Sequence, residues 1–253
     1  MEIVLLTALG VGGATVIGAL IGFLFKSPSH KFNDIILSFA AGVMLAAAVV
    51  GLIIPSLEYG EGVAPLIITI LGIFAGAATL NLIDKLVPHL HKMSGADIEA
   101  HPEKTARLNR VLLFVIAIAI HNLPEGIAAG VSFGTGNVTQ AITVAGGIAL
   151  QNIPEGMVII APMIAAGMSR RRTFLIALGT GIVEVIGTFI GYFAVSISTA
   201  VLPFALAFAG GTMLYVISDE MIPETHAHGA ERAATYSLLI GFAVMLAFDF
   251  LLG

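Results

Sequence analysis

Long apolar segments alternate with short polar connections along almost the whole chain. Each of the eight segments is close to the roughly 20 residues that a membrane-spanning helix needs. Together they leave no room for a separate soluble domain, so the pattern predicts an all-α membrane protein in which residues 1–253 form a single integral-membrane domain. The expected transmembrane helices cover approximately residues 3–25, 35–54, 63–87, 108–133, 139–167, 173–196, 200–218 and 234–252.

Composition and charge agree with this pattern and orient it. The chain is 58% hydrophobic and 11% charged, whereas soluble proteins carry about 25% charged residues. All eleven Lys and Arg residues fall in or beside alternate connections, and basic residues in short loops collect on the cytoplasmic side. We therefore expect a multi-pass protein of the cell membrane (inner or plasma membrane) whose termini are both extracytoplasmic.

One polar connection stands apart from the others. Residues 88–107 follow the third apolar segment and contain His89, His91 and His101. This segment is expected to be a mobile, cytosolic, His-containing loop within the single domain. The chain has no cysteine, which excludes disulfides and thiolate metal sites.

A hexapeptide occurs twice inside the apolar segments, as HNLPEG at 121–126 and QNIPEG at 151–156. Residues four apart lie on one face of an α-helix, so the first and fifth residues of each copy can point at the same atom. A third carboxylate, Glu184, lies within the sixth segment. The candidate metal ligands of the two copies are His121, Asn122, Glu125, Gln151, Asn152 and Glu155.

These carboxylates lack an internal Lys or Arg partner, although each would cost about 2.5–3.5 kcal/mol at the centre of a membrane helix. Protons or a divalent metal could compensate the charge. Imidazole, carboxylate and amide oxygen together suit zinc, iron or manganese better than sodium. The ligands are too many for one tetrahedral zinc, but two adjacent ions bridged by Glu125 and Glu155 would use them all.

These polar residues have other possible interpretations. A single buried Glu such as Glu184 can be protonated and hydrogen-bonded, and a single His is more often a packing residue, but chance explains the duplication poorly. An intramembrane metal-dependent hydrolase would also bury His and Glu near a metal. An HExxH motif is absent and no spare general base is evident, so no enzyme is expected. A metal-sensing membrane protein or a channel is a further alternative.

The chain resembles the ZIP (Zrt/Irt-like) family of divalent-metal transporters, in particular its bacterial GufA-type branch. The resemblance rests on the two hexapeptides, SFAAGVMLAA at 38–47, the GxxE that ends at Glu184, and ISDEMIPETHAH at 217–228. It implies a ZIP fold of eight helices in an inverted 3+2+3 arrangement, with the first and last three helices related as inverted repeats around the fourth and fifth.

The resemblance also implies a binuclear site between helices 4, 5 and 6. One metal position would be formed by His121, Glu125, Gln151 and Glu155, and its neighbour by Asn122, Glu125, Asn152, Glu155 and Glu184. Residues toward the cytosolic exit would be Asp84, His89, His91, Asp219 and Glu220, with Glu224, His226 and His228 close by. The plain alternative for the exit residues is a solvated loop.

The implied function is uptake of a divalent cation into the cytoplasm, with zinc as the first expectation and cadmium, iron or manganese as alternatives. The metal is the transported substrate and not a cofactor. Many family members have His at the position of Gln151 and some have Asp at that of Asn152. The amide at 151 therefore weakens the preference for zinc, and the amide at 152 removes one negative charge from the second position. The expected partners are metal ions and the lipid bilayer, with a homodimer left open and no nucleic acid. An elevator-like and a rocking movement both fit.

Overall fold

The computed structural model of the chain describes residues 1–25, 28–86 and 119–252. Every regular element within these ranges is helical, so the all-α prediction is confirmed for this part of the chain. Residues 119–132 are helical. The named elements are α1 (Glu2–Gly22), α2 (His30–Ala46), the π-helix η1 (Ala47–Ile53), α3 (Ile54–Ser56), α4 (Ala64–Leu86), the 3-10 helix η4 (Phe133–Thr135), α6 (Val138–Val158), α7 (Ile160–Ala165), α8 (Arg170–Ile197), η5 (Thr199–Val201), α9 (Leu202–Val216), the π-helix η6 (Ile217–Met221), α10 (Ile222–Thr225) and α11 (Glu231–Leu252).

Within the described ranges, seven helices are long and apolar enough to cross a membrane. The expected fourth span, 108–133, is described only from residue 119 onward. The 88–107 segment, with His89 and His91, lies outside the described residues, and so does the side chain of Asp84. The seven candidate spans are Glu2–Gly22, His30–Ser56, Ala64–Ile83, Val138–Ala165, Arg170–Ile197, Leu202–Thr225 and Glu231–Leu252.

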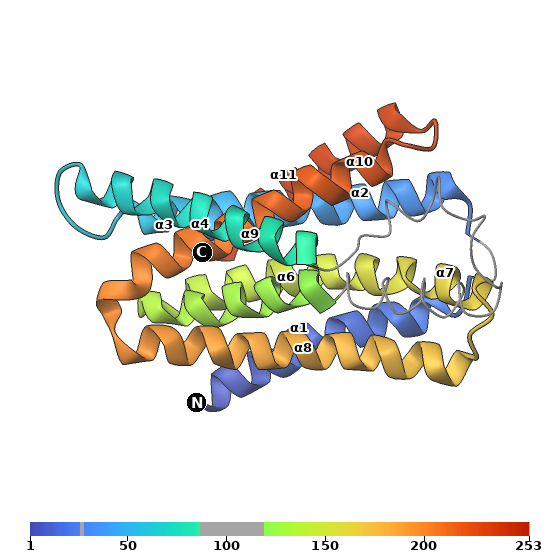
Figure 1. Ribbon diagram of the computed structural model, residues 1–253, viewed down its shortest axis with the longest axis horizontal. Helices are drawn as coiled ribbons and strands as arrows, with labels where there is room; N and C mark the ends of the chain where they lie inside the picture. Colours follow the sequence, from blue (N-terminus) through green and yellow to red (C-terminus); the bar gives the residue numbers. More distant parts are fainter. Residues whose placement is uncertain (26–27, 87–118, 253) are drawn as a thin grey trace.

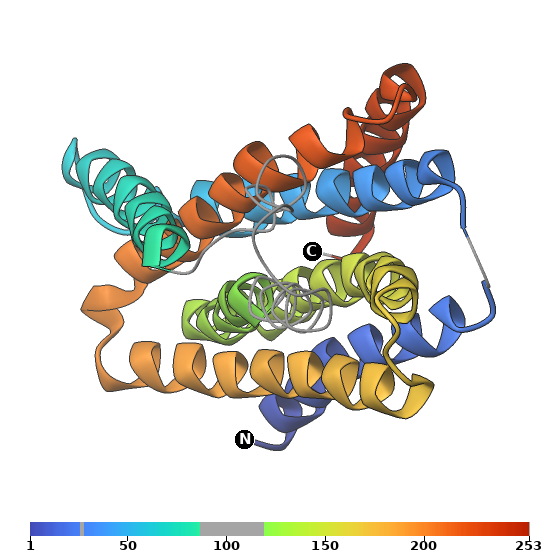
Figure 2. The same ribbon diagram turned by 45° about the vertical axis from the view of Figure 1, so that its right-hand side comes forward.

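The helices form two groups that lie side by side (Figure 1). One group contains α1, α6, α8 and the helical segment 119–132, and the other contains α2, α4, α9 and α11. Figure 2 shows the same two groups, with the green and yellow helices facing the blue α2. On α8, Ile182, Ile186 and Ile190 form an exposed stripe at four-residue spacing. Such an apolar stripe suits contact with lipid, and the chain is a multi-pass membrane protein.

Close helix packing depends on glycines, because small residues let helix backbones approach each other. At Gly12 an added Cβ would lie 2.3 Å from the carbonyl oxygen of Gly181, and at Gly181 it would lie 2.4 Å from that of Gly12. Gly18 and Gly187 similarly face carbonyl oxygens of the neighbouring helices. The backbones of α1 and α8 therefore touch where the two glycines meet.

The sequence contains an internal repeat whose copies lie on different helices. ALGVGGATVIGALIG at 8–22 matches ALGTGIVEVIGTFIG at 177–191 in nine of fifteen positions, and FAAGVMLA at 39–46 matches FAGGTMLY at 208–215. Both pairs of segments are 169 residues apart. The first pair lies on α1 and α8 and the second on α2 and α9, and the two helices of each pair run in opposite directions (Figure 1).

Two helix boundaries differ from the expected ones. The seventh span was expected to end at residue 218, but η6 and α10 continue it to Thr225. A solvated loop was the alternative for its polar residues, but Glu220 is part of the π-helix η6 and is half-buried beside His121. The second span begins at His30, earlier than expected, because the Ser29 hydroxyl accepts the backbone N–H of Phe32 and caps the helix.

Candidate functional site

Glycine brings each hexapeptide against a neighbouring helix. Gly126, on the helix 119–132, packs on the backbone of Glu184 in α8, and Gly156, on α6, packs on the backbone of Thr15 in α1. In both cases an added Cβ would lie 2.2 Å from the carbonyl oxygen of the facing residue. The final glycine of each copy is therefore needed for the same close approach, and it sets the polar residues of the copy beside α8 or α1.

The Glu184 carboxylate joins the two copies. Its Oε1 accepts hydrogen bonds from Asn122 Nδ2 and from the Thr15 hydroxyl, the latter at 2.6 Å. Its Oε2 accepts one from Asn152 Nδ2 at 2.7 Å. Glu184 and Asn152 have no exposed surface. The amides of both copies thus converge on one buried carboxylate.

A second contact links the copies directly, because Gln151 Nε2 donates to Glu125 Oε1 at 2.9 Å. Several oxygens of the same side chains remain buried without a hydrogen-bond donor. A buried acceptor without a donor costs about 1–3 kcal/mol, and a cation would remove that cost. The unpartnered oxygens of the two copies are Glu125 Oε2, Gln151 Oε1, Asn152 Oδ1 and Glu155 Oε1.

The chemistry of these atoms favours a cation over an anion. All four are carboxylate or amide oxygens, and the sequence has no Lys or Arg between Arg110 and Arg170 that could supply a positive charge. Among the described residues, no three His, Asp or Glu side chains are grouped closely enough to hold a metal by themselves. A metal ion bound here would need further ligands, such as the amide oxygens of Gln151 and Asn152.

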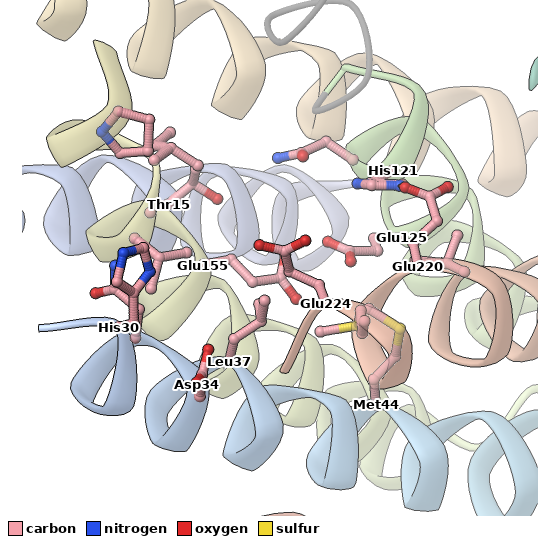
Figure 3. Close-up of a pocket in the computed structure, with 18 of the residues that line it drawn as sticks. Thr15, His30, Asp34, Leu37, Met44, His121, Glu125, Glu155, Glu220 and Glu224 are labelled. Carbon is pink, nitrogen blue, oxygen red and sulfur yellow. The ribbon is translucent and has the colours of Figure 1, made fainter. Parts of the chain in front are cut away.

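His121 has a different neighbour. Its Nε2 lies 2.6 Å from Glu220 Oε2, on η6 of the other helix group. Figure 3 shows this pair beside the carboxylates of Glu125 and Glu155. The sequence predicted His121 for the metal site and Glu220 for the exit, but the structure brings the two residues together.

A cavity of about 290 Å³ extends from the hexapeptides toward one end of the bundle. Glu125 and Glu155 line it inside the bundle, whereas Asp34 and His228 line it where α2 begins and α10 has ended (Figure 3). Met44 forms part of its wall. The cavity thus gives the buried carboxylates a route toward that end.

The five predicted exit residues whose side chains the structure describes divide into two sets. Glu220, Glu224 and His228 line the cavity. Asp219 is exposed, and both Asp219 and His226 lie outside the cavity lining.

Sequence reasoning missed Asp34 and His30 beside this end of the cavity. His228 Nδ1 lies 3.0 Å from Asp34 Oδ1, and the His228 ring stacks on that of His30 with 4.6 Å between centroids. Asp34 is buried, and its Oδ2 has no hydrogen-bond partner. The polar run at the start of α2 was the available signal, but a polar run before an apolar segment usually indicates a loop.

Comparison with known proteins identifies the family. The sequence profile described as "ZIP Zinc transporter" matches residues 84–249. The chain is 40% identical to "Zinc transporter GufA" of Myxococcus xanthus, over 98% of both chains. It is 39% identical to "Zinc transporter ZIPB" of Bordetella bronchiseptica, over 95% of this chain and 78% of that one. It is 31% identical to the human "Zinc transporter ZIP11", over 95% and 94%. The chain belongs to the ZIP zinc transporter family.

Proposed function

We propose that this protein carries zinc into the cytoplasm through a site formed by the two hexapeptides and Glu184. The observation that carries the proposal is the set of buried carboxylate and amide oxygens that have no hydrogen-bond donor. A divalent cation supplies the charge that these oxygens lack. The relatives are named as zinc transporters, which favours zinc as the substrate.

The site holds two adjacent ions in this proposal. His121, Glu125, Gln151 and Glu155 form one position, and Asn122, Glu125, Asn152, Glu155 and Glu184 form the other. The hydrogen bond from Gln151 to Glu125 and those from the two Asn residues to Glu184 support the grouping. In each amide the NH₂ group is the donor, so the oxygen stays available for a metal. An arriving ion at the first position competes with Glu220 for His121.

The complete fold has eight spans, with the eighth supplied by residues 108–133, in an inverted 3+2+3 arrangement. The repeat between α1 and α8, and that between α2 and α9, support the inversion, since equivalent helices run in opposite directions. Both termini are extracytoplasmic. Lys31, Arg170 and Arg232 lie at the starts of α2, α8 and α11, which are at the same end of the bundle (Figure 1). Basic residues collect on the cytoplasmic side, so this end is the cytoplasmic one.

The direction of release follows from the cavity. It runs from Glu125 and Glu155 to Asp34 and His228, at the same end as the basic residues. Water and metal therefore reach the site from the cytoplasmic side in this conformation, while Glu224 and His228 lie along the way out. The group of α1, α6, α8 and 119–132 moves against the other group to open the opposite side. The bilayer covers the exposed apolar faces, and a homodimer buries one of them.

A flux measurement tests the proposal. Purified protein in liposomes loaded with a zinc-sensitive dye should take up external zinc faster than protein-free liposomes, and cadmium should compete. The same vesicles are assayed for cleavage of lipid and of a peptide substrate. Absence of zinc and cadmium flux in correctly folded protein would contradict transport, and cleavage without flux would favour the hydrolase alternative.

Changing Gln151 to His should shift the metal preference toward zinc. Imidazole suits zinc better than an amide oxygen does, and Gln151 is buried beside Glu125. We expect the ratio of zinc to manganese flux to rise about tenfold, corresponding to roughly 1.4 kcal/mol of differential binding. Competition flux across zinc, cadmium, iron and manganese measures it. Gln140→His, near the start of the same helix, is the control and should leave the ratio unchanged.

A further inference from the structure

The internal repeat pairs two residues of the buried site. Thr15 of α1 and Glu184 of α8 are 169 residues apart, the spacing of the whole repeat, and each is followed by Val-Ile-Gly. The first repeat therefore has a hydroxyl where the second has a carboxylate. Thr15 is not among the metal ligands predicted from the sequence.

The two positions are also equivalent in space. Gly18 packs on the carbonyl of Ile153 in the second hexapeptide, and Gly187 packs on that of Leu123, the same position in the first. Gly12 and Gly181, again 169 residues apart, pack on each other. A reciprocal contact of this kind means that an approximate two-fold axis passes between α1 and α8, relating the two halves of the site.

The Glu184 carboxylate lies close to this axis. It accepts one hydrogen bond from Asn122 and one from Asn152, which are equivalent residues of the two hexapeptides. The Thr15 hydroxyl lies 2.6 Å from the same carboxylate. A point on a two-fold axis is equally far from equivalent positions of the two repeats. A glutamate at position 15 can therefore bring its carboxylate to the place that the Glu184 carboxylate occupies.

We infer that Thr15 is a positioning residue of the metal site. We also infer that the carboxylate near the two-fold axis, here called the axial carboxylate, can be supplied by position 15 of the first repeat as well as by position 184 of the second. In the natural protein the Thr15 hydroxyl donates a hydrogen bond to Glu184 Oε1 and so orients the carboxylate. Because threonine is uncharged, the site has a single axial carboxylate. Thr15 is buried, with 2% of its surface exposed, so this hydroxyl serves the site and not the solvent. The inference rests on the proposed function, because the carboxylate is assigned to metal binding.

Exchanging the two residues tests the second half of the inference. Glu184→Thr alone should lower zinc flux, and cadmium affinity in detergent, by at least about a hundredfold, since loss of a supporting partner alone costs 10–100-fold. The double variant Thr15→Glu/Glu184→Thr should have a zinc flux and a cadmium affinity within about tenfold of those of the natural protein. A folded exchange variant as inactive as Glu184→Thr would overturn the interchange of the carboxylate.

A second pair of variants tests the positioning role without a new charge. Thr15→Val removes the hydroxyl at nearly constant shape and should raise the KM for zinc about tenfold, with unchanged maximal flux and melting temperature. Thr15→Ser keeps the hydroxyl and should bring KM back to within twofold of the natural value. A natural KM in Thr15→Val would overturn the role of Thr15, whether or not the exchange variant folds.

The two proposals fail in different ways. If the natural protein carries no metal, the proposed function is wrong, and equilibrium cadmium binding to the same variants still decides the inference. If the natural protein carries zinc and neither the exchange nor the hydroxyl affects flux and binding as described, the inference alone is wrong.

Discussion

Replacing Glu125 or Glu155 with glutamine should lower zinc uptake by at least about a hundredfold while the protein stays folded. Both carboxylates line the cavity, and each retains a buried oxygen without a hydrogen-bond donor. Glutamine keeps the shape but removes the charge that the cation needs. Because a charge in the membrane costs about 2.5–3.5 kcal/mol, its removal should leave the melting temperature of the metal-free protein unchanged or higher.

Flux and melting temperature should be measured on the same preparations, since an unfolded protein would also be inactive. Glu58→Gln is a matched control. Glu58 is an exposed carboxylate just after α3, at the end of the second span that lies away from His30. It should retain the natural flux. Natural flux in Glu125→Gln and Glu155→Gln would show that these residues do not bind the transported ion.

The second large effect is expected from Gly12→Ala, which should destabilise the protein and reduce uptake severely. An added Cβ at Gly12 would lie 2.3 Å from the carbonyl oxygen of Gly181, so α1 and α8 must separate. Overpacking of this kind costs about 1–3 kcal/mol. It would also displace Thr15 from Glu184, since each of these residues follows one of the two glycines by three positions.

Gly13→Ala provides the control for this substitution on the same helix. A Cβ at Gly13 has no atom within 4 Å, and alanine favours a helix by about 1 kcal/mol over glycine. The melting temperature of Gly13→Ala should therefore equal or exceed that of the natural protein. Equal melting temperatures and equal flux for Gly12→Ala and Gly13→Ala would exclude the close contact between α1 and α8.

The membrane spans and the core of the site were accessible from sequence because both depend on local patterns. A bilayer requires long apolar runs, and the two hexapeptides interrupt such runs with the same polar residues. Glu184 stood out as a third carboxylate without a basic partner. The structure brings these residues together by the hydrogen bonds of Asn122 and Asn152 to Glu184.

What the sequence did not reveal depends on contacts between distant segments. Thr15 is an ordinary residue for a membrane helix, and its importance appears only through its hydrogen bond to Glu184, 169 positions away. Asp34 directly precedes the expected second span, and its place beside the cavity depends on its contact with His228, 194 positions away. The seventh span extends past Asp219 and Glu220 because Glu220 meets His121 across the interior, a pairing that no local pattern encodes.

The two hexapeptides are similar in sequence but not in their contacts. His121 pairs with Glu220 of the other helix group, whereas Gln151 donates to Glu125 within its own group. Gln151 thus connects the two hexapeptides, and His121 connects the first hexapeptide to η6. A metal ion bound at His121, as proposed above, would therefore act on the contact between the two groups.

The most direct test of a metal site between the two hexapeptides is an anomalous difference map from crystals grown with cadmium. A peak is predicted within about 2.0–2.6 Å of carboxylate oxygens of both Glu125 and Glu155, with a second, neighbouring peak beside Glu184. Peaks only at surface histidines such as His226, with none at Glu125 and Glu155, would contradict the site.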